Sequence, residues 1–232
     1  MKKILSAILL VTISANIFGM LGFFSYLIFE PEEIQAVSSN VYVNLAVTGE
    51  VSVACSTSTE QMDPAISGMT GGTANGQTTC TVITNNETGF NMTLYSTTSP
   101  AMKCISGGCS TSADYFASYT PANNSVPDYD WAVAAANSEF GYTVEPATAG
   151  DTATMFKDNG STTCNQVGGT NTANSCWNYA STTAATIISR TTATAGGGEA
   201  EVIKFRAESG ASHFQPEGNY QATIILTTVV NS

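Results

Sequence analysis

Positively charged residues are scarce in this chain. Seven Lys and Arg side chains stand against eighteen Asp and Glu, which gives a formal net charge of −11 at pH 7. A nucleic-acid-binding protein needs a basic patch, and attachment to an anionic lipid surface needs one as well. The composition therefore excludes nucleic acid and a charged membrane surface as partners, and it predicts an acidic, well-solvated surface.

Residues that commonly carry catalysis or bind metals are equally scarce. The chain has one histidine, His213, and no Gly-x-Ser-x-Gly turn that would present a serine nucleophile. Asp128 and Asp130 are a close acidic pair, but the further oxygen ligands that calcium needs at defined spacings are missing. The cysteines lack the spacing of a zinc site. We predict no catalytic residue, no cofactor and no metal, and hence a protein that is not an enzyme.

Long apolar runs are absent except at the N-terminus. Lys2 and Lys3 precede an uncharged run over residues 4–29, and Ala36 follows a short acidic stretch. These features are typical of a secretory signal, although a run of this length can also span a bilayer. We predict an apolar export helix within residues 1–36, either a cleaved signal or an uncleaved anchor. Residues 37–232 are then a single domain at the cell surface or outside the cell, with no membrane contact of their own.

The chain does contain an even number of cysteines, all of them after the export segment. Six cysteines in an exported chain indicate disulfides, although six allow 15 connectivities. Proximity along the chain favours Cys104–Cys109 around a short loop and Cys164–Cys176 around a polar loop, which leaves Cys55–Cys80. Each bridge is expected to stabilise the fold by about 2–4 kcal/mol.

Short alternating apolar runs, separated by Gly, Asn, Ser, Thr and Pro, recur through the rest of the chain. This pattern is typical of a β-sandwich or barrel, and helix signals are nearly absent. Strands are predicted at residues 80–84, 90–96, 140–145, 185–189, 201–207 and 218–230. The first two are expected to form a hairpin. We predict an all-β fold, an antiparallel β-sandwich of the Ig-like or jelly-roll-like Greek-key type.

Two long segments, about 97–130 and 160–180, lack regular alternation and are predicted to be disulfide-closed loops. In or beside them lie four aromatic residues that either pack in the core or form a platform for a sugar: Tyr129, Trp131, Trp177 and Tyr179. In the predicted strand 201–207, Lys204 and Arg206 alternate with apolar residues and are expected to face solvent.

The longest alternating stretch is VYVNLAVTGEVSVAC, residues 41–55. It predicts one long, half-buried strand that divides near Gly49. The inner half, 51–55, is expected to belong to the domain's own sheet. The outer half is our candidate for a strand donated to a neighbouring molecule, through the side chains of Val41, Val43, Leu45 and Val47.

Three segments together resemble a known family. The strand VTGEVSVAC, the segment TTCTVITNNETGFNMTL and the ending PEGNYQATIILTTVV are similar to the secreted β-sandwich subunits of the spore coat protein U and pilin type. The last strand of that family commonly has the pattern aGtYtdTvtvt, which Gly218, Tyr220 and Thr223 match. The resemblance covers about residues 41–96 and 200–230. A weaker likeness to camelysin and TasA-like fibre subunits is limited to size, export and β content.

The resemblance implies a structural subunit that polymerises by lending a strand to its neighbour, because a sheet that lacks a strand exposes unpaired backbone groups. We therefore expect an exported, non-enzymatic pilus or fibre subunit that associates with itself or with another surface protein. The alternative is a monomeric binding module, which would recognise a glycan or a partner cell through the loops at 97–130 and 160–180.

Overall fold

The computed structural model describes residues 42–121, 127–170 and 174–232, and residues 47–232 form one compact unit. The predicted all-β fold is confirmed, since the described residues contain strands and two short 3₁₀ segments, η1 (Ala149–Asp151) and η2 (Thr154–Phe156). The strands are β1 (Val51–Cys55), β2 (Gly72–Thr84), β3 (Phe90–Ser96), β4 (Met102–Ser106), β5 (Tyr115–Ser118), β6 (Ser138–Pro146), β7 (Ala185–Arg190), β8 (Glu199–Ser209), β9 (Asn219–Ala222) and β10 (Ile224–Val230). The predicted export segment 1–36 lies outside the described residues.

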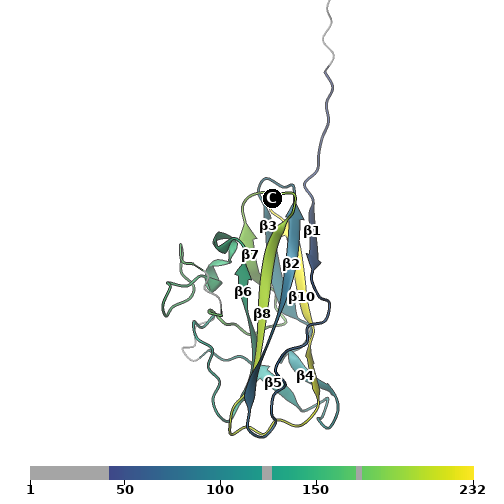
Figure 1. Ribbon diagram of the computed structural model, residues 1–232. Helices are drawn as coiled ribbons and strands as arrows, with labels where there is room; N and C mark the ends of the chain where they lie inside the picture. The colour runs from purple at the N-terminus through teal and green to yellow at the C-terminus, as the bar shows by residue number, and fades with distance from the viewer. Residues whose placement is uncertain (1–41, 122–126, 171–173) are drawn as a thin grey trace, which may run out of the picture. The chain divides into compact units, whose positions relative to one another are not determined.

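The strands form two sheets that enclose a common core (Figure 1). The larger sheet has the order β1-β2-β8-β6-β5-β4-β9, and the smaller has the order β10-β3-β7. Val82 and Ile203 from the larger sheet and Phe90 and Ile187 from the smaller are completely buried. The pairs are antiparallel except β5 with β6, which is parallel. The expectation of a purely antiparallel fold is therefore wrong at this one pair.

Several predicted strands coincide with observed ones. Residues 90–96 are β3, residues 185–189 lie in β7, and residues 201–207 lie in β8. In β3, buried and half-buried side chains alternate along the whole strand. The alternation was informative because one face of this strand is turned to the core and the other is not.

The predicted hairpin of residues 80–84 and 90–96 is wrong. β2 pairs with β1 and β8 in the larger sheet, whereas β3 pairs with β10 and β7 in the smaller. The turn between β2 and β3 crosses from one sheet to the other, with a positive φ of 80° at Gly89. A Cβ at Gly89 would lie 2.2 Å from the carbonyl oxygen of Arg190, so only glycine fits this crossing.

The predicted strand over residues 41–55 is shorter than expected, because only 51–55 pairs with a neighbour. The register runs from Val51 opposite Thr84 to Cys55 opposite Cys80. At Thr84 the partner strand β2 ends, and the side chain of Asn85 accepts a hydrogen bond from Glu50 N–H at 2.7 Å. Residues 47–50, directly before Val51, are therefore not part of a strand.

The predicted final strand, 218–230, is divided between the two sheets. β9 pairs with β4 in the larger sheet, and β10 pairs with β3 in the smaller. Thr223 lies between them, where the chain changes sheet. This change explains why the sequence is apolar on both faces, since the inward direction differs on the two sides of Thr223.

The predicted loop 97–130 is also partly wrong, because it contains the strands β4 and β5. These strands have five and four residues, too few for alternation to stand out. The alanine-rich stretch 128–140 forms no helix, and its end belongs to β6.

Three disulfides join the pairs expected from chain proximity: Cys55–Cys80, Cys104–Cys109 and Cys164–Cys176. The first joins the end of edge strand β1 to the middle of β2, and Cys80 is completely buried. Three disulfides are typical of a protein that folds in an oxidising compartment outside the cytoplasm.

Candidate functional site

The residues before β1 expose a row of apolar side chains. Residues 42–50 form no secondary structure. The exposed fractions are 84% for Tyr42, 89% for Val43, 88% for Leu45 and 77% for Val47. The first donor candidate, Val41, lies outside the described residues. Apolar side chains at alternate positions of an extended segment are costly to keep in water and are typical of a segment that another surface covers.

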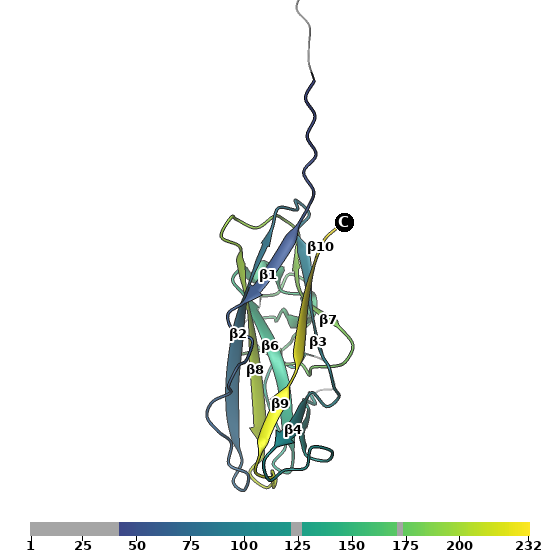
Figure 2. The same ribbon diagram turned by 90° about the vertical axis from the view of Figure 1, so that its right-hand side faces the viewer.

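Among the described residues, the strand β10 has a hydrogen-bonded neighbour on one side only. It pairs with β3 along its whole length, while β1 lies near it without pairing (Figure 2). Asn231 N–H donates to Gly89 O, on the β3 side, at 3.0 Å. Because backbone N–H groups alternate in direction along a strand, those of Thr228 and Val230 point away from β3. β10 is therefore an edge with available backbone groups.

The final-strand motif serves the fold. Gly218 passes close to a disulfide, since a Cβ there would lie 2.2 Å from Cys109 Sγ. The hydroxyl of Tyr220 donates to the carbonyl oxygen of Pro216 at 2.8 Å. With Thr223 at the change of sheet, the three motif residues shape the path of the chain and do not form a surface site.

A cluster of Tyr119, Trp131 and Trp177, here called the aromatic cluster, covers the outer face of β6. Tyr119 stacks on Trp131 with 4.2 Å between ring centroids, and Trp131 meets Trp177 edge-on at 5.1 Å. Gly141 in β6 makes room for it, since a Cβ there would lie 2.9 Å from the Trp131 ring. Trp177 is 1% exposed and acts in packing. Of the other aromatic candidates, Tyr129 packs against the core and Tyr179 is partly exposed, so the four do not form one platform.

Arg206 on β8 packs against the aromatic cluster. Its guanidinium carbon lies 4.4 Å from the Trp177 ring centroid, and its Nε donates to Asn75 Oδ1 at 2.8 Å. Burial lowers the pKa of Arg206, while Glu208 and Tyr119 raise it. The guanidinium stays charged because its ordinary pKa is very high. It is thus a partly desolvated cation that is held in a fixed orientation.

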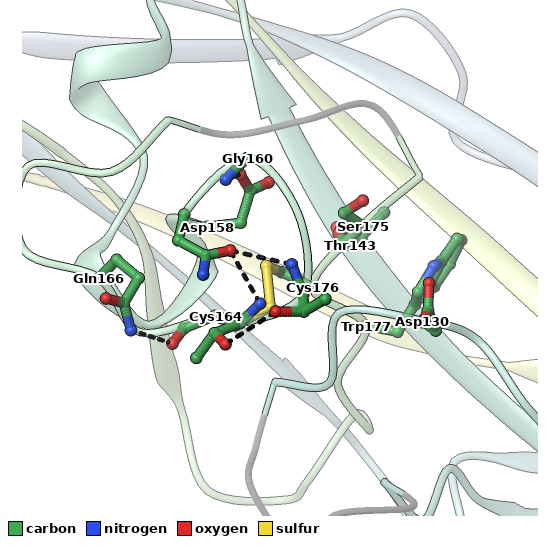
Figure 3. The surroundings of a disulfide bond; sticks show 12 residues. Asp130, Thr143, Asp158, Gly160, Cys164, Gln166, Ser175, Cys176 and Trp177 are labelled. Carbon is green, nitrogen blue, oxygen red and sulfur yellow. Dashed lines mark hydrogen bonds between the residues drawn. A yellow bond between two sulfur atoms is a disulfide. The ribbon is translucent and has the colours of Figure 1, made fainter.

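The Cys164–Cys176 disulfide fixes the segment that carries Trp177 (Figure 3). On one side of the disulfide, Gln166 Nε2 donates to Cys164 O at 3.0 Å. On the other side, Trp177 N–H donates to Asp128 O at 2.7 Å, and Asp128 N–H donates back at 2.9 Å. The position of the Trp177 ring is therefore determined by covalent and backbone contacts.

A polar groove of about 540 Å³ lies between this segment and the chain at residues 60–63. Its sides are formed by Asn174 and Trp177 and by Glu60, Gln61 and Asp63. The neighbouring strands β2 and β8 contribute Gly76, Phe205 and four polar side chains to its lining: Asn75, Gln77, Lys204 and Arg206. In the register of the two strands, Asn75 lies opposite Arg206 and Gln77 opposite Lys204. The prediction that Lys204 and Arg206 face away from the core agrees with this arrangement.

The charged groups of the polar groove are nearly balanced. Glu60 Oε1 accepts a hydrogen bond from Gln77 N–H at 3.2 Å, and Asp63 is held by two backbone hydrogen bonds to Asn75. Lys204 forms an ion pair with Glu145. The polar groove therefore contains both cations and carboxylates next to side-chain amides.

An unusual ionisable group lies on the inner face of β8. Glu201 is completely buried, and neither carboxylate oxygen has a hydrogen-bond partner among the described residues. Burial raises the pKa of Glu201 to about 8, with further increases from Glu199 and Asp151 and an opposing effect of Arg190. Near neutral pH this side chain is mostly protonated.

The acid–base candidates are not brought together into an active site. One ring nitrogen of His213 lies 3.0 Å from Ala136 O and the other 3.2 Å from Gln215 Oε1. Asp128 is buried and Asp130 is exposed. Within the described ranges, no group of three His, Cys, Asp or Glu side chains is arranged to hold a metal.

Tyr119, Arg206 and Glu201 were not identified from the sequence as members of these arrangements, although one of the three could have been found. Tyr119 stood in a predicted loop, and the stacking of Arg206 on Trp177 joins residues far apart in the chain. Glu201 was a visible signal, because it has the same parity as Ile203 and so belongs to the apolar face of its strand. A charged residue at a core position is uncommon and would have identified it.

Comparisons with family models, curated proteins and solved structures find no match to this chain. In the part of the chain that the structure describes, no helix has the length and apolar character needed to cross a membrane.

Proposed function

We propose that this chain is an exported, non-enzymatic structural subunit of a cell-surface fibre, in which residues 41–47 of one copy pair with the edge strand β10 of the next. The observation that carries the proposal is the exposure of Val43, Leu45 and Val47, all at least 77% exposed, at alternate positions ahead of β1. Burial of apolar surface contributes about 25 cal/mol per Å², so a neighbour that covers these side chains would be bound favourably.

The acceptor edge matches the donor in length and chemistry. β10 has seven residues, as does the segment 41–47. The outward N–H groups at Thr228 and Val230 supply backbone donors to an added strand, and apolar side chains at the end of β10 are exposed. An extended segment gains main-chain hydrogen bonds and side-chain burial in one step.

The donor and the acceptor are different surfaces of the chain. An interface between unlike surfaces is repeated from copy to copy, and it gives an open filament unless the rotation happens to close a ring. This favours a fibre over a closed dimer. The disulfides support a location outside the cytoplasm, where such a fibre would be displayed.

The test compares two variants that differ by one position. Leu45→Asp places a charge on the apolar side of the donor, and the matched control Asn44→Asp places the same charge on the opposite side. We expect filaments of the parent chain and of Asn44→Asp in negative-stain microscopy, and a monomer for Leu45→Asp by sedimentation velocity. A parent chain that stays monomeric at every concentration would contradict the proposal, as would equal behaviour of the two variants.

A monomeric surface binding module is the second candidate function. The polar groove favours it, and the predicted binding loop 160–180 contributes Asn174 and Trp177 to that groove. A concentration-independent monomer in the same experiment would select this candidate.

A further inference from the structure

The polar groove has no role in the proposed strand pairing and presents a distinct chemistry. Asn75, Gln77, Glu60 and Arg206 are planar polar side chains with two donor or acceptor atoms side by side. Such pairs match two neighbouring hydroxyl groups of a sugar ring, each of which donates and accepts. A drug-like apolar ligand is disfavoured, because pockets for such ligands are lined mainly by hydrophobic side chains.

Arg206 has unused donors in the polar groove. Its Nε is engaged by Asn75, and the described residues make no hydrogen bond to its two terminal nitrogens. The stacking on Trp177 keeps the guanidinium in place without occupying these donors. A fixed fork of two N–H groups binds a pair of oxygen atoms with little loss of side-chain entropy.

The balance of charge limits the kind of ligand. The lining of the groove contains the carboxylates of Glu60 and Asp63 as well as the cations of Lys204 and Arg206. A phosphate or a polyanion would meet these carboxylates as well as the cations, and like charges in contact cost free energy. A hydroxyl-rich ligand uses the carboxylates as acceptors and the cations as donors.

We infer that the polar groove is a saccharide-binding site, in which Arg206, Asn75 and Gln77 donate to ring oxygens and Glu60 and Asp63 accept from hydroxyl groups. The disulfide-held segment and the aromatic cluster keep the site in its binding geometry before the ligand arrives. The site is independent of assembly, so it operates in a fibre subunit and in a monomer alike.

The test measures binding of the full chain, with its disulfides formed, to immobilised neutral and uronic-acid-containing oligosaccharides on an array. Affinity electrophoresis in native gels that contain mannan or polygalacturonate then gives dissociation constants. We expect retardation in the mannan gel, in which the Arg206 fork meets hydroxyl groups. Retardation by polygalacturonate alone would mean that the groove takes a polyanion, which would contradict the inference of a hydroxyl-recognising site.

Two matched glutamine variants locate the binding. Gln77 lies in the polar groove and Gln221 lies outside it on β9, and both side chains are exposed on strands. We expect Gln77→Ala to weaken binding at least tenfold and Gln221→Ala to change it by less than twofold. Arg206→Lys, which keeps the charge and removes the fork, should also weaken binding at least tenfold. Failure of both polysaccharides and of the array to bind, or equal binding by the two glutamine variants, would overturn the inference.

Discussion

The outer face of β6 and β8 and the segment before β1 are opposite kinds of surface. On the outer face, Arg206, Trp131 and Trp177 contact one another, and a disulfide holds the segment that covers them. In residues 42–47, by contrast, large apolar side chains are almost fully exposed. The first surface is completed by contacts within one chain, whereas the second is covered by another chain in the proposed fibre.

The residues that stabilise the fold are therefore different from the residues proposed to join one copy to the next. In the proposed account, stability and preorganised recognition belong to the outer face of the compact unit 47–232, whereas assembly depends on the donor segment and on the acceptor edge β10. Changes near the aromatic cluster should therefore alter stability and leave assembly intact, while changes in the segment 42–47 should do the reverse.

Removal of the Cys164–Cys176 disulfide is expected to destabilise the chain more than any of the single substitutions below. The two cysteines are 12 residues apart, and chain-entropy arguments give about 3 kcal/mol for a loop of that size. Paired replacement by serine should lower the free energy of unfolding by that amount in urea titrations. The same replacement at Cys104–Cys109, which are 5 residues apart, should cost less. If loss of the Cys104–Cys109 disulfide lowered the unfolding free energy more, the Cys164–Cys176 disulfide would not be the one that stabilises the outer face.

Because the carboxyl of Glu201 is buried, we expect the stability of the fold to depend on pH. We expect no such contribution of Glu201 to assembly. Its folded-state pKa is raised to about 8 from 4.5, so the folded chain retains a proton that the unfolded chain has released in that interval. The contribution to stability is present below the unfolded pKa and is lost as the pH rises toward 8. Glu201→Gln should remove a decline of about 2 kcal/mol between pH 6 and pH 8.

The measurement is urea denaturation of both proteins at several pH values, with sedimentation velocity to follow assembly. Parallel stability profiles of the parent and Glu201→Gln would show that the carboxyl does not carry the pH dependence. The assembly of the two proteins at a fixed pH should be the same.

Gly141→Ala tests whether the aromatic cluster is packed as tightly as the distances indicate. The added Cβ would lie 2.7 Å from Asn178 O and 2.9 Å from Trp131, so the cluster must shift. We expect a loss of about 2 kcal/mol by thermal or urea unfolding. Gly197→Ala is the matched control, because no atom lies within 4 Å of the Cβ it would add. Equal effects of the two substitutions would mean that the outer face tolerates repacking.

Leu45→Asp should have the smallest effect on stability. The side chain is 88% exposed, so its replacement removes little buried surface and should change the unfolding free energy by less than about 0.5 kcal/mol. The same substitution should abolish assembly. A large loss of stability in the monomer would mean that the segment packs within its own chain and would remove the contrast between the two regions.

The sequence predicted strands well where one face of a strand is buried and the other is not. The segments at 90–96 and 201–207 were identified because alternation reflects burial directly, whereas in 185–189 the neighbouring Ile187 and Ile188 are both buried. Pairing could not be predicted in the same way. Val82 and Phe90 both point to the core, and nothing in their pattern tells that they belong to different sheets.

The start of β1 and the walls of the polar groove could not be predicted either, because both depend on residues far away in the chain. Alternation continues through residues 41–55, but the strand begins at Val51 because its partner β2 ends at Thr84. The solvent-facing positions of Lys204 and Arg206 were predictable from their parity. The polar groove around them was not, since its sides come from 60–63 and 174–177, far away in the chain.

The most direct test of strand donation mixes two chains that are each defective in one partner surface. Leu45→Asp lacks the donor, and Thr228→Pro lacks an outward N–H of the acceptor edge without removing a hydrogen bond to β3. Val230→Pro serves as a second acceptor variant if the melting temperature of Thr228→Pro shows that it is not folded. Analytical ultracentrifugation should find each variant monomeric alone and a one-to-one dimer in the mixture, because one intact donor meets one intact acceptor. No dimer in the mixture, or filaments formed by either variant alone, would contradict the account.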